Sequence, residues 1–297
     1  MQSLPPSTPT PAVYLMGGVV PAVAERDIQI LQLVGQLAIC DRSIQAVSDI
    51  VESNLGGESI DFAGWSGLAR RTAAIYNLID PLELFQNPWK SERWSKYVKG
   101  EVIKYWTNLL HENVASYPSL DMLDTSRLDL SSPHPIWLAA GTNPVSVTKA
   151  TVVSWLLLNV YKTAERLHKM RKLKSPECLS CLAPVDDQVH FGLQCLSLVE
   201  IRSEYMSKFT EACPNISKYL SNPKVLLVAL LDPFSPLVPN DLNNGWRNKD
   251  EAYKLSRNYF YDLHKKREKI NENKNCQQTQ PEEDDTTQII INVYENI

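Results

Sequence analysis

The sequence lacks any apolar run long enough to cross a lipid bilayer, and it lacks a secretory leader. Its most apolar stretches, SWLLLNV and VLLVALL, are far shorter than the roughly 20 residues that a spanning helix needs. The first residues, MQSLPPSTPTP, have neither the basic region nor the continuous apolar core of a signal peptide. These absences predict a soluble intracellular protein, in the nucleus or the cytoplasm, without a membrane partner.

Familiar catalytic motifs are missing as well. The chain contains no P-loop, no G-x-G-x-x-G and no H-E-x-x-H pattern. The tetrapeptide GWSG at 64–67 matches a nucleophile elbow only loosely, because its second glycine comes one position early. Asp186 and Asp187 resemble the paired aspartates of polymerases, but they lie in a Pro-flanked loop without hydrophobic hairpin strands, and we interpret them as solvated acids. We therefore expect a chain that is not an enzyme and has no small-molecule substrate.

A strong net charge is absent too. The formal value is only −4, so the whole-chain balance gives no reason to expect nucleic acid as a partner. The charge is nevertheless unevenly distributed, because residues 149–174 contain seven Lys or Arg and one Glu, whereas residues 177–200 contain four acids and no Lys or Arg. A basic segment therefore runs directly into an acidic one.

The chain has only six cysteines and five histidines, yet four of these eleven residues lie within one eighteen-residue stretch, CLSCLAPVDDQVHFGLQC. Cys178, Cys181, His190 and Cys195 follow the spacing C-x2-C-x8-H-x4-C. A C-x2-C pair can form a knuckle whose two thiolates point at one ion, and H-x4-C places two further ligands about one helical turn apart. Three sulfurs and an imidazole suit Zn²⁺ better than calcium or magnesium, and four protein ligands complete the closed tetrahedral shell of a structural site.

Two other interpretations fit the cysteines alone. Pro176, Ser180 and Pro184 predict a loop, in which the cysteines could form a redox-active C-x-x-C or be buried as small apolar side chains. In a reducing compartment, clustered cysteines more often bind metal than form disulfides. Because His190 and Cys195 complete the ligand spacing, the sequence favours structural Zn²⁺.

Apolar residues recur at helical spacing along most of the chain, which predicts a mainly α fold, an irregular helical assembly with a small zinc-stapled CCHC loop. The clearest helices are expected at about 90–115, 224–231 and 250–270, with at most short strands around 128–130. We expect six successive regions: an irregular N-terminal segment at 1–21, a helical domain at 22–117, a Pro-rich connector at 118–144, a basic helix plus CCHC zinc subdomain at 145–220, C-terminal helices at 221–270, and a disordered acidic tail at 271–297.

One predicted helix begins at Ser146 or Thr148 and continues to the metal loop, with a basic C-terminal half. Cations at the C-terminal end of a helix complement its dipole, but six basic side chains within thirteen residues exceed what such capping requires. They are candidate contacts to nucleic-acid phosphates, with a solvated helix end as the alternative. The residues concerned are Lys162, Arg166, Lys169, Arg171, Lys172 and Lys174.

The metal stretch with its surroundings, SPECLSCLAPVDDQVHFGLQCLSLVEIR, resembles the zinc-binding segment near the C-terminus of animal non-LTR retrotransposon polyproteins. In that family the segment lies downstream of the reverse transcriptase. Three other passages are similar to such elements, so the resemblance covers roughly residues 1–215: the first 38 residues, LELFQNPWKSERWSKYVKGEVIKYW at 82–106, and SSPHPIWLA at 131–139 with TKATVVSWLLLNVYKTAERLHK after it. The family's ligands correspond to Cys178, Cys181, His190 and Cys195, and its His-Phe pair to His190 and Phe191.

The resemblance implies a nucleic-acid-binding accessory domain without the polymerase, because the palm with its catalytic aspartates and the endonuclease domain are both missing from this sequence. The zinc loop would fix the end of the basic helix on template RNA or target DNA, and Tyr161 or Phe191 could stack on unpaired bases. The alternatives are a protein interaction or scaffold module stapled by zinc, or a transposon relic without a selected function.

Overall fold

The structure is a computed structural model that describes residues 8–40, 65–81 and 83–278. Every regular element within these ranges is a helix, which confirms the mainly α prediction. The chain divides into two compact units, Met1–Leu138 and Ala139–Ile297, and the division lies inside the predicted Pro-rich connector. Within the described ranges, no helix combines the length and the apolar character that a bilayer crossing requires.

Unit 1, residues 1–138, is built around the packing of α2 on α6. Trp94 of α6 is buried against α2, where its indole Nε1 donates a hydrogen bond of 2.7 Å to the carbonyl oxygen of Leu31. Tyr76 is buried in the same core, where its hydroxyl donates a hydrogen bond of 2.7 Å to the buried carboxylate of Asp27. The helices of this unit are α1 (Thr10–Gly17), α2 (Ala22–Ala38), α4 (Trp65–Ile75), α5 (Glu83–Gln86), α6 (Ser91–Ala115) and α7 (Pro135–Leu138).

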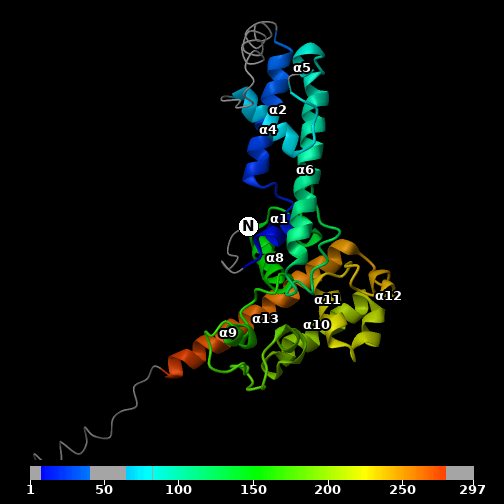
Figure 1. The fold of residues 1–297 in the computed structure, drawn as a ribbon. Coiled ribbons are helices and arrows are strands. Elements are labelled where there is room, and N and C mark those ends of the chain that lie inside the picture. Colours follow the sequence, from blue (N-terminus) through cyan, green and yellow to red (C-terminus); the bar gives the residue numbers. More distant parts are fainter. Residues whose placement is uncertain (1–7, 41–64, 82, 279–297) are drawn as a thin grey trace, which may run out of the picture. The chain divides into compact units, whose positions relative to one another are not determined.

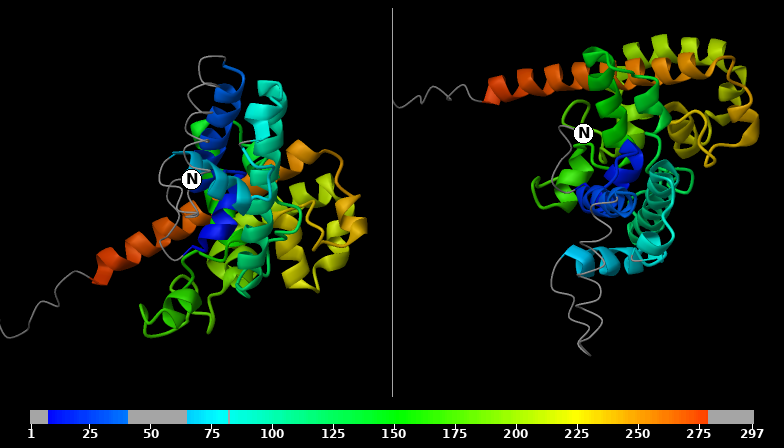
Figure 2. Two further views of the ribbon diagram at one scale, coloured as in Figure 1. Left: turned by 45° about the horizontal axis from the view of Figure 1, so that its top comes forward. Right: turned by 90° about the horizontal axis from the view of Figure 1, so that it is seen from above.

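Unit 2, residues 139–297, is organised by its long last helix, α13, which packs along α8 and α10 (Figures 1 and 2). α13 buries Tyr253, Tyr259, Phe260 and Leu263. The helices of this unit are α8 (Pro144–Leu157), α9 (Ala164–Lys169), the π-helical turn η1 (His190–Gln194), the 3₁₀ turn η2 (Leu196–Leu198), α10 (Val199–Ala212), the 3₁₀ helix η3 (Pro214–Tyr219), α11 (Pro223–Leu231), α12 (Asn240–Asn243) and α13 (Lys249–Gln278).

Several predicted boundaries were wrong. The segment 1–21 is not wholly irregular, because Thr10–Gly17 forms α1 with Ala12, Leu15 and Met16 buried. At 128–130, where at most short strands were expected, the structure has none, so that expectation is not contradicted. There the carboxylate of Asp129 accepts hydrogen bonds from the backbone N–H groups of Ser131 and Ser132, which folds this stretch into a turn. The predicted tail at 271–297 begins too early, since α13 continues to Gln278 and only the later residues lie outside the described ranges.

The predicted continuous basic helix is wrong because the chain breaks at Leu158–Thr163. Asn143, not Ser146 or Thr148, caps α8, and its side chain accepts from the backbone N–H of Ser146. Asn159 then adopts a left-handed conformation with φ of 51°, which a right-handed helix cannot contain. A new cap at Thr163 starts the short helix α9, so the basic residues occupy a loop, a single short helix and a second loop.

Candidate metal centre

Two cysteines of the cluster lie in a tight knuckle, Cys178 to Ala183, whose backbone is held by its own hydrogen bonds. The N–H of Leu182 donates to the carbonyl oxygen of Cys178 at 2.8 Å, and the N–H of Cys178 donates to that of Ala183 at 2.9 Å. Leu182 has φ of 61°, a left-handed conformation that lets the chain reverse within these few residues. The reversal places Cys178 and Cys181 on one side of the knuckle, as the C-x2-C spacing predicted.

The other two candidate ligands lie at opposite ends of the π-helical turn η1. The N–H of Cys195 donates to the carbonyl oxygen of His190 at 2.7 Å, the i to i+5 bond that defines such a turn. Asp187 begins the turn by accepting from the N–H of His190 at 2.6 Å. The H-x4-C spacing therefore does correspond to one turn, but to a π turn, in which residues five apart come onto the same side.

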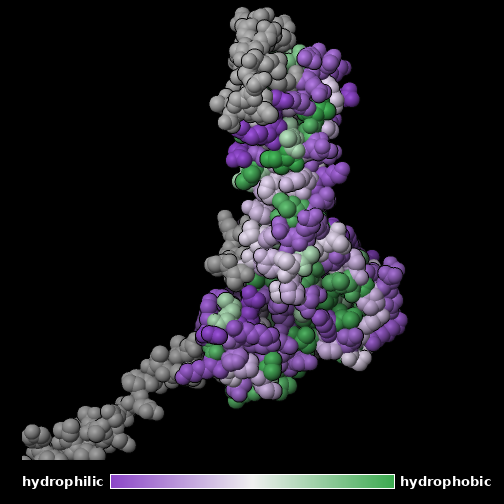
Figure 3. Space-filling model, in the orientation of Figure 1, coloured by the Kyte–Doolittle hydropathy of each residue, from purple (hydrophilic) through white to green (hydrophobic). Residues whose placement is uncertain are grey.

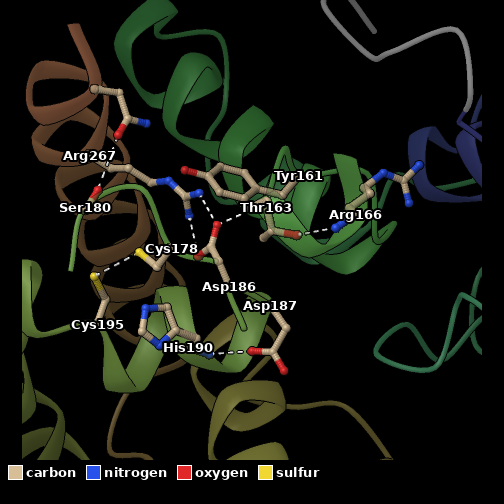
Figure 4. Close-up of polar contacts among 12 residues, drawn as sticks. Tyr161, Thr163, Arg166, Cys178, Ser180, Asp186, Asp187, His190, Cys195 and Arg267 are labelled. Carbon is tan, nitrogen blue, oxygen red and sulfur yellow. Dashed lines mark hydrogen bonds and ion pairs between the residues drawn. The ribbon is translucent and has the colours of Figure 1, made fainter. Parts of the chain in front are cut away.

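The four candidate ligand atoms converge, all within 4.8 Å of one another. The Sγ atoms of Cys178 and Cys195 are 3.9 Å apart (Figure 4). The Sγ of Cys181 is 3.3 Å from Nε2 of His190. A tetrahedral Zn²⁺ with bonds of about 2.3 Å to sulfur separates two thiolates by about 3.8 Å. The spacing of these atoms, brought together from two segments of the loop, thus fits a metal ion of this size.

A hydrogen bond joins the thiols of Cys178 and Cys195, and either sulfur can donate the proton. The Cys195 thiol, followed by the backbone N–H groups of Cys181 and Ser180, stabilises the Cys178 thiolate and lowers its pKa well below the usual value. The same contact, together with burial, raises the pKa of Cys195. A cation placed between the two sulfurs would take over the role of that proton, since metal binding to cysteine displaces protons.

Asp186 is not a solvated acid, and that prediction was wrong. Its side chain is fully buried and forms an ion pair with Arg267 of α13 (Figure 4). It also accepts a hydrogen bond of 2.7 Å from the N–H of Ala164, at the start of α9. Burial raises the pKa of Asp186, and the guanidinium of Arg267 opposes that rise. This single carboxylate thus joins the metal loop to α9 and to α13.

Tyr161 and Phe191 lie beneath the Arg267 guanidinium and support it. Their rings stack with centroids 4.5 Å apart, and the Arg267 guanidinium lies 5.3 Å from the centroid of Phe191. Both aromatic side chains are buried, at 5% and 0% exposed. They are therefore part of the core, and neither presents a free ring face to a base.

The six basic candidates do not share one environment. Arg166 is half-buried and donates to the carbonyl oxygen of Asn159, so it holds the break between α8 and α9. Lys169 forms an exposed ion pair of 2.6 Å with Glu165. Within the part of the chain that the structure describes, no acidic side chain pairs with the four remaining cations, all of them exposed: Lys162, Arg171, Lys172 and Lys174.

Sequence reasoning found the four candidate ligands and missed the ion pair that anchors them. The ligands carry a signal because their spacing is local, whereas Asp186 and Arg267 are 81 positions apart and no short motif links them. Cys213 fitted no ligand spacing, and its buried thiol lies away from the cluster, 3.7 Å from the carbonyl oxygen of Leu242.

Comparisons with known proteins give no family for this chain. No protein-family model matches it, and neither the curated proteins nor the solved structures include a match.

Proposed function

We propose that this chain is a non-catalytic nucleic-acid-binding protein whose binding segment is held by a structural Zn²⁺ ion on Cys178, Cys181, His190 and Cys195. The donor set supports zinc, because three soft thiolates and one imidazole disfavour calcium and magnesium. The four donors would fill the tetrahedral shell and leave no open position for a substrate or an activated water. Such an ion contributes folding free energy and no chemistry.

One observation carries the nucleic-acid part of the proposal. Five exposed cations, on either side of and within the short helix α9, lead directly into the metal loop, and only one of them has an acidic partner among the described residues. Lysines and arginines that are exposed and clustered attract phosphates and release counterions on binding. The proposed contacts are Lys162, Lys169, Arg171, Lys172 and Lys174.

The proposal predicts that binding to RNA or DNA weakens steeply with salt and depends on this segment. Replacing Lys169, Arg171 and Lys172 together by Glu should lower affinity strongly at low salt. Loss of three phosphate contacts should also reduce the slope of log affinity against log salt by roughly 2 to 3. A gel-shift or anisotropy titration across salt concentrations measures both quantities.

The matched control is a triple variant on α6, Lys96→Glu, Lys99→Glu and Lys104→Glu. It makes the same change in net charge on three lysines that are also exposed. We expect this control to keep nearly all of the affinity and the salt slope. Equal losses in the two variants would mean that only overall charge matters, and unchanged binding by the first variant would reject the proposed segment.

The resemblance to the C-terminal part of non-LTR retrotransposon polyproteins supports the same function and adds an origin. We propose that the chain derives from such an element, in which an RNA-directed DNA polymerase would precede it. The genomic sequence immediately upstream tests this origin, because an intact or decayed polymerase frame is expected there.

A further inference from the structure

Each cysteine of the metal cluster is followed by a leucine that faces solvent. Leu179, Leu182 and Leu196 are 51%, 75% and 72% exposed, and the last two are the most exposed large hydrophobic side chains among the described residues. By contrast, the cysteines that precede Leu179 and Leu196 are buried: Cys178 is 1% exposed and Cys195 is 2% exposed. The loop thus directs its sulfurs inward and a set of apolar side chains, here called the leucine rim (Leu179, Leu182 and Leu196), outward.

The backbone fixes the leucine rim in place. Ser197 donates its hydroxyl to the carbonyl oxygen of Ser180 at 2.9 Å, which ties the segment carrying Leu196 to the knuckle carrying Leu179 and Leu182. Leu182 keeps its left-handed backbone, φ 61°, although glycine or asparagine adopts that conformation at lower cost. The reversal of the knuckle accounts for the backbone of Leu182 but not for its side chain, which is three-quarters exposed and contributes little to the packing of this chain.

The charge of the segment that precedes the leucine rim in the sequence narrows the class of ligand. Arg171, Lys172 and Lys174 are exposed and lie within seven residues before Cys178 on the same segment. Figure 3 shows apolar patches among hydrophilic surface over this part of unit 2. Apolar side chains next to several cations match a chain of anionic phosphates whose bases are free to leave the backbone. An apolar protein helix would match the leucines but would leave the cations without partners.

We infer that the leucine rim binds unpaired bases, so that this site takes single-stranded nucleic acid in preference to a duplex. In a duplex the base faces are stacked on each other and only base edges are available in the grooves, whereas a single strand can place a base face on an apolar surface. This inference rests on the proposed function and specifies its ligand: phosphates contact the basic segment and bases cover the leucines.

Three fluorescent probes of one length test the inference: a single-stranded oligonucleotide, its duplex, and an abasic single strand that has phosphates without bases. The variant is Leu182→Asn with Leu196→Ser, in which asparagine suits the left-handed position. The control is Leu220→Ser with Leu237→Ser, two leucines of the same unit that are also exposed, at 60% and 46%. Metal content is measured for every protein.

The wild-type protein should bind the base-bearing single strand roughly tenfold more tightly than the abasic strand, which corresponds to burial of part of two leucine side chains. The rim variant should lose this difference and keep the salt slope and its metal, whereas the control should behave as wild type. The comparison of the two strands on the wild-type protein needs no variant, so it decides the matter even if the rim variant misfolds.

Two outcomes overturn the inference and leave the proposed function standing: equal affinity for the base-bearing and abasic strands, or a rim variant that binds every probe as tightly as wild type. The second outcome would assign the leucines to another kind of partner, such as a protein. If no probe binds at low salt, the proposed function itself fails, and the inference with it.

Discussion

The carboxylate of Asp186 holds the loop of the candidate metal centre in place without being one of its candidate ligands. Its two oxygens accept from Arg267 and from the N–H of Ala164, while its own backbone N–H donates to the carbonyl oxygen of Pro176 at 2.8 Å. Burying such a pair costs desolvation on both sides, so the pair adds little compared with an apolar contact of the same volume. Removing one member of the pair destabilises the protein strongly, because the other charge then remains buried without a partner.

We therefore expect Asp186→Asn to destabilise the metal-loaded protein by about 3 to 5 kcal/mol, since it leaves the guanidinium of Arg267, 8% exposed, without its counter-charge. Asp187→Asn is the matched control. An asparagine oxygen can still accept from the N–H of His190, and we expect a cost below about 1 kcal/mol. Urea unfolding followed by circular dichroism compares the two, and similar losses would show that the ion pair does not hold the loop.

At the scale of single helices, apolar periodicity predicted α6, α11 and most of α13 because each buries apolar side chains against a neighbour. It failed between α8 and α9. The apolar spacing continues through Val160 and Ala164, and it masked the left-handed Asn159 and the cap at Thr163 that end one helix and start the next. The four candidate ligands were predictable because their spacing is local, whereas their anchor depends on tertiary contacts that no local pattern contains.

Two helical glycines in unit 1, Gly35 of α2 and Gly100 of α6, allow the effect of helix propensity on stability to be measured separately from the effect of packing. In both α2 and α6, alanine is favoured over glycine by about 1 kcal/mol in the helical backbone. A Cβ added at Gly35 would lie 2.1 Å from Cδ1 of Trp94, which is buried and fixed by its hydrogen bond to Leu31. Overpacking of this kind costs about 1 to 3 kcal/mol or more. We expect Gly35→Ala to destabilise the protein by at least about 1 kcal/mol in thermal or urea unfolding.

Gly100 of α6 provides the control, since a Cβ there meets no atom within 4 Å. Gly100→Ala should stabilise the same unit by up to about 1 kcal/mol. If Gly35→Ala destabilises the protein while Gly100→Ala stabilises it, the close contact between α2 and α6 lies at Gly35. A stabilised Gly35→Ala protein would instead mean that Trp94 does not pack there.

At the scale of the whole molecule, the division into two units assigns the candidate metal centre to unit 2. Unit 1 has its own core, in which Trp94, Val98 and Val102 of α6 pack with α2, and no group of candidate ligands occurs in its described residues. A structural Zn²⁺ supplies on the order of 10 kcal/mol in small zinc domains, a value similar to the entire stability of many domains. The loop should therefore depend on the ion, and unit 1 should not.

Hydrogen exchange read by mass spectrometry measures that dependence segment by segment. When a chelator removes the ion, exchange should accelerate first at 176–198, then in the part of α13 around Arg267, because Asp186 connects the two. Amides of α2 and α6 should keep their protection. The Cys181→Ser protein should contain no zinc where the wild type contains one equivalent, and it should exchange like the chelated wild type without any chelator. Loss of protection in α2 and α6 on the same timescale would contradict this assignment, because it would make the ion a condition for the fold of both units.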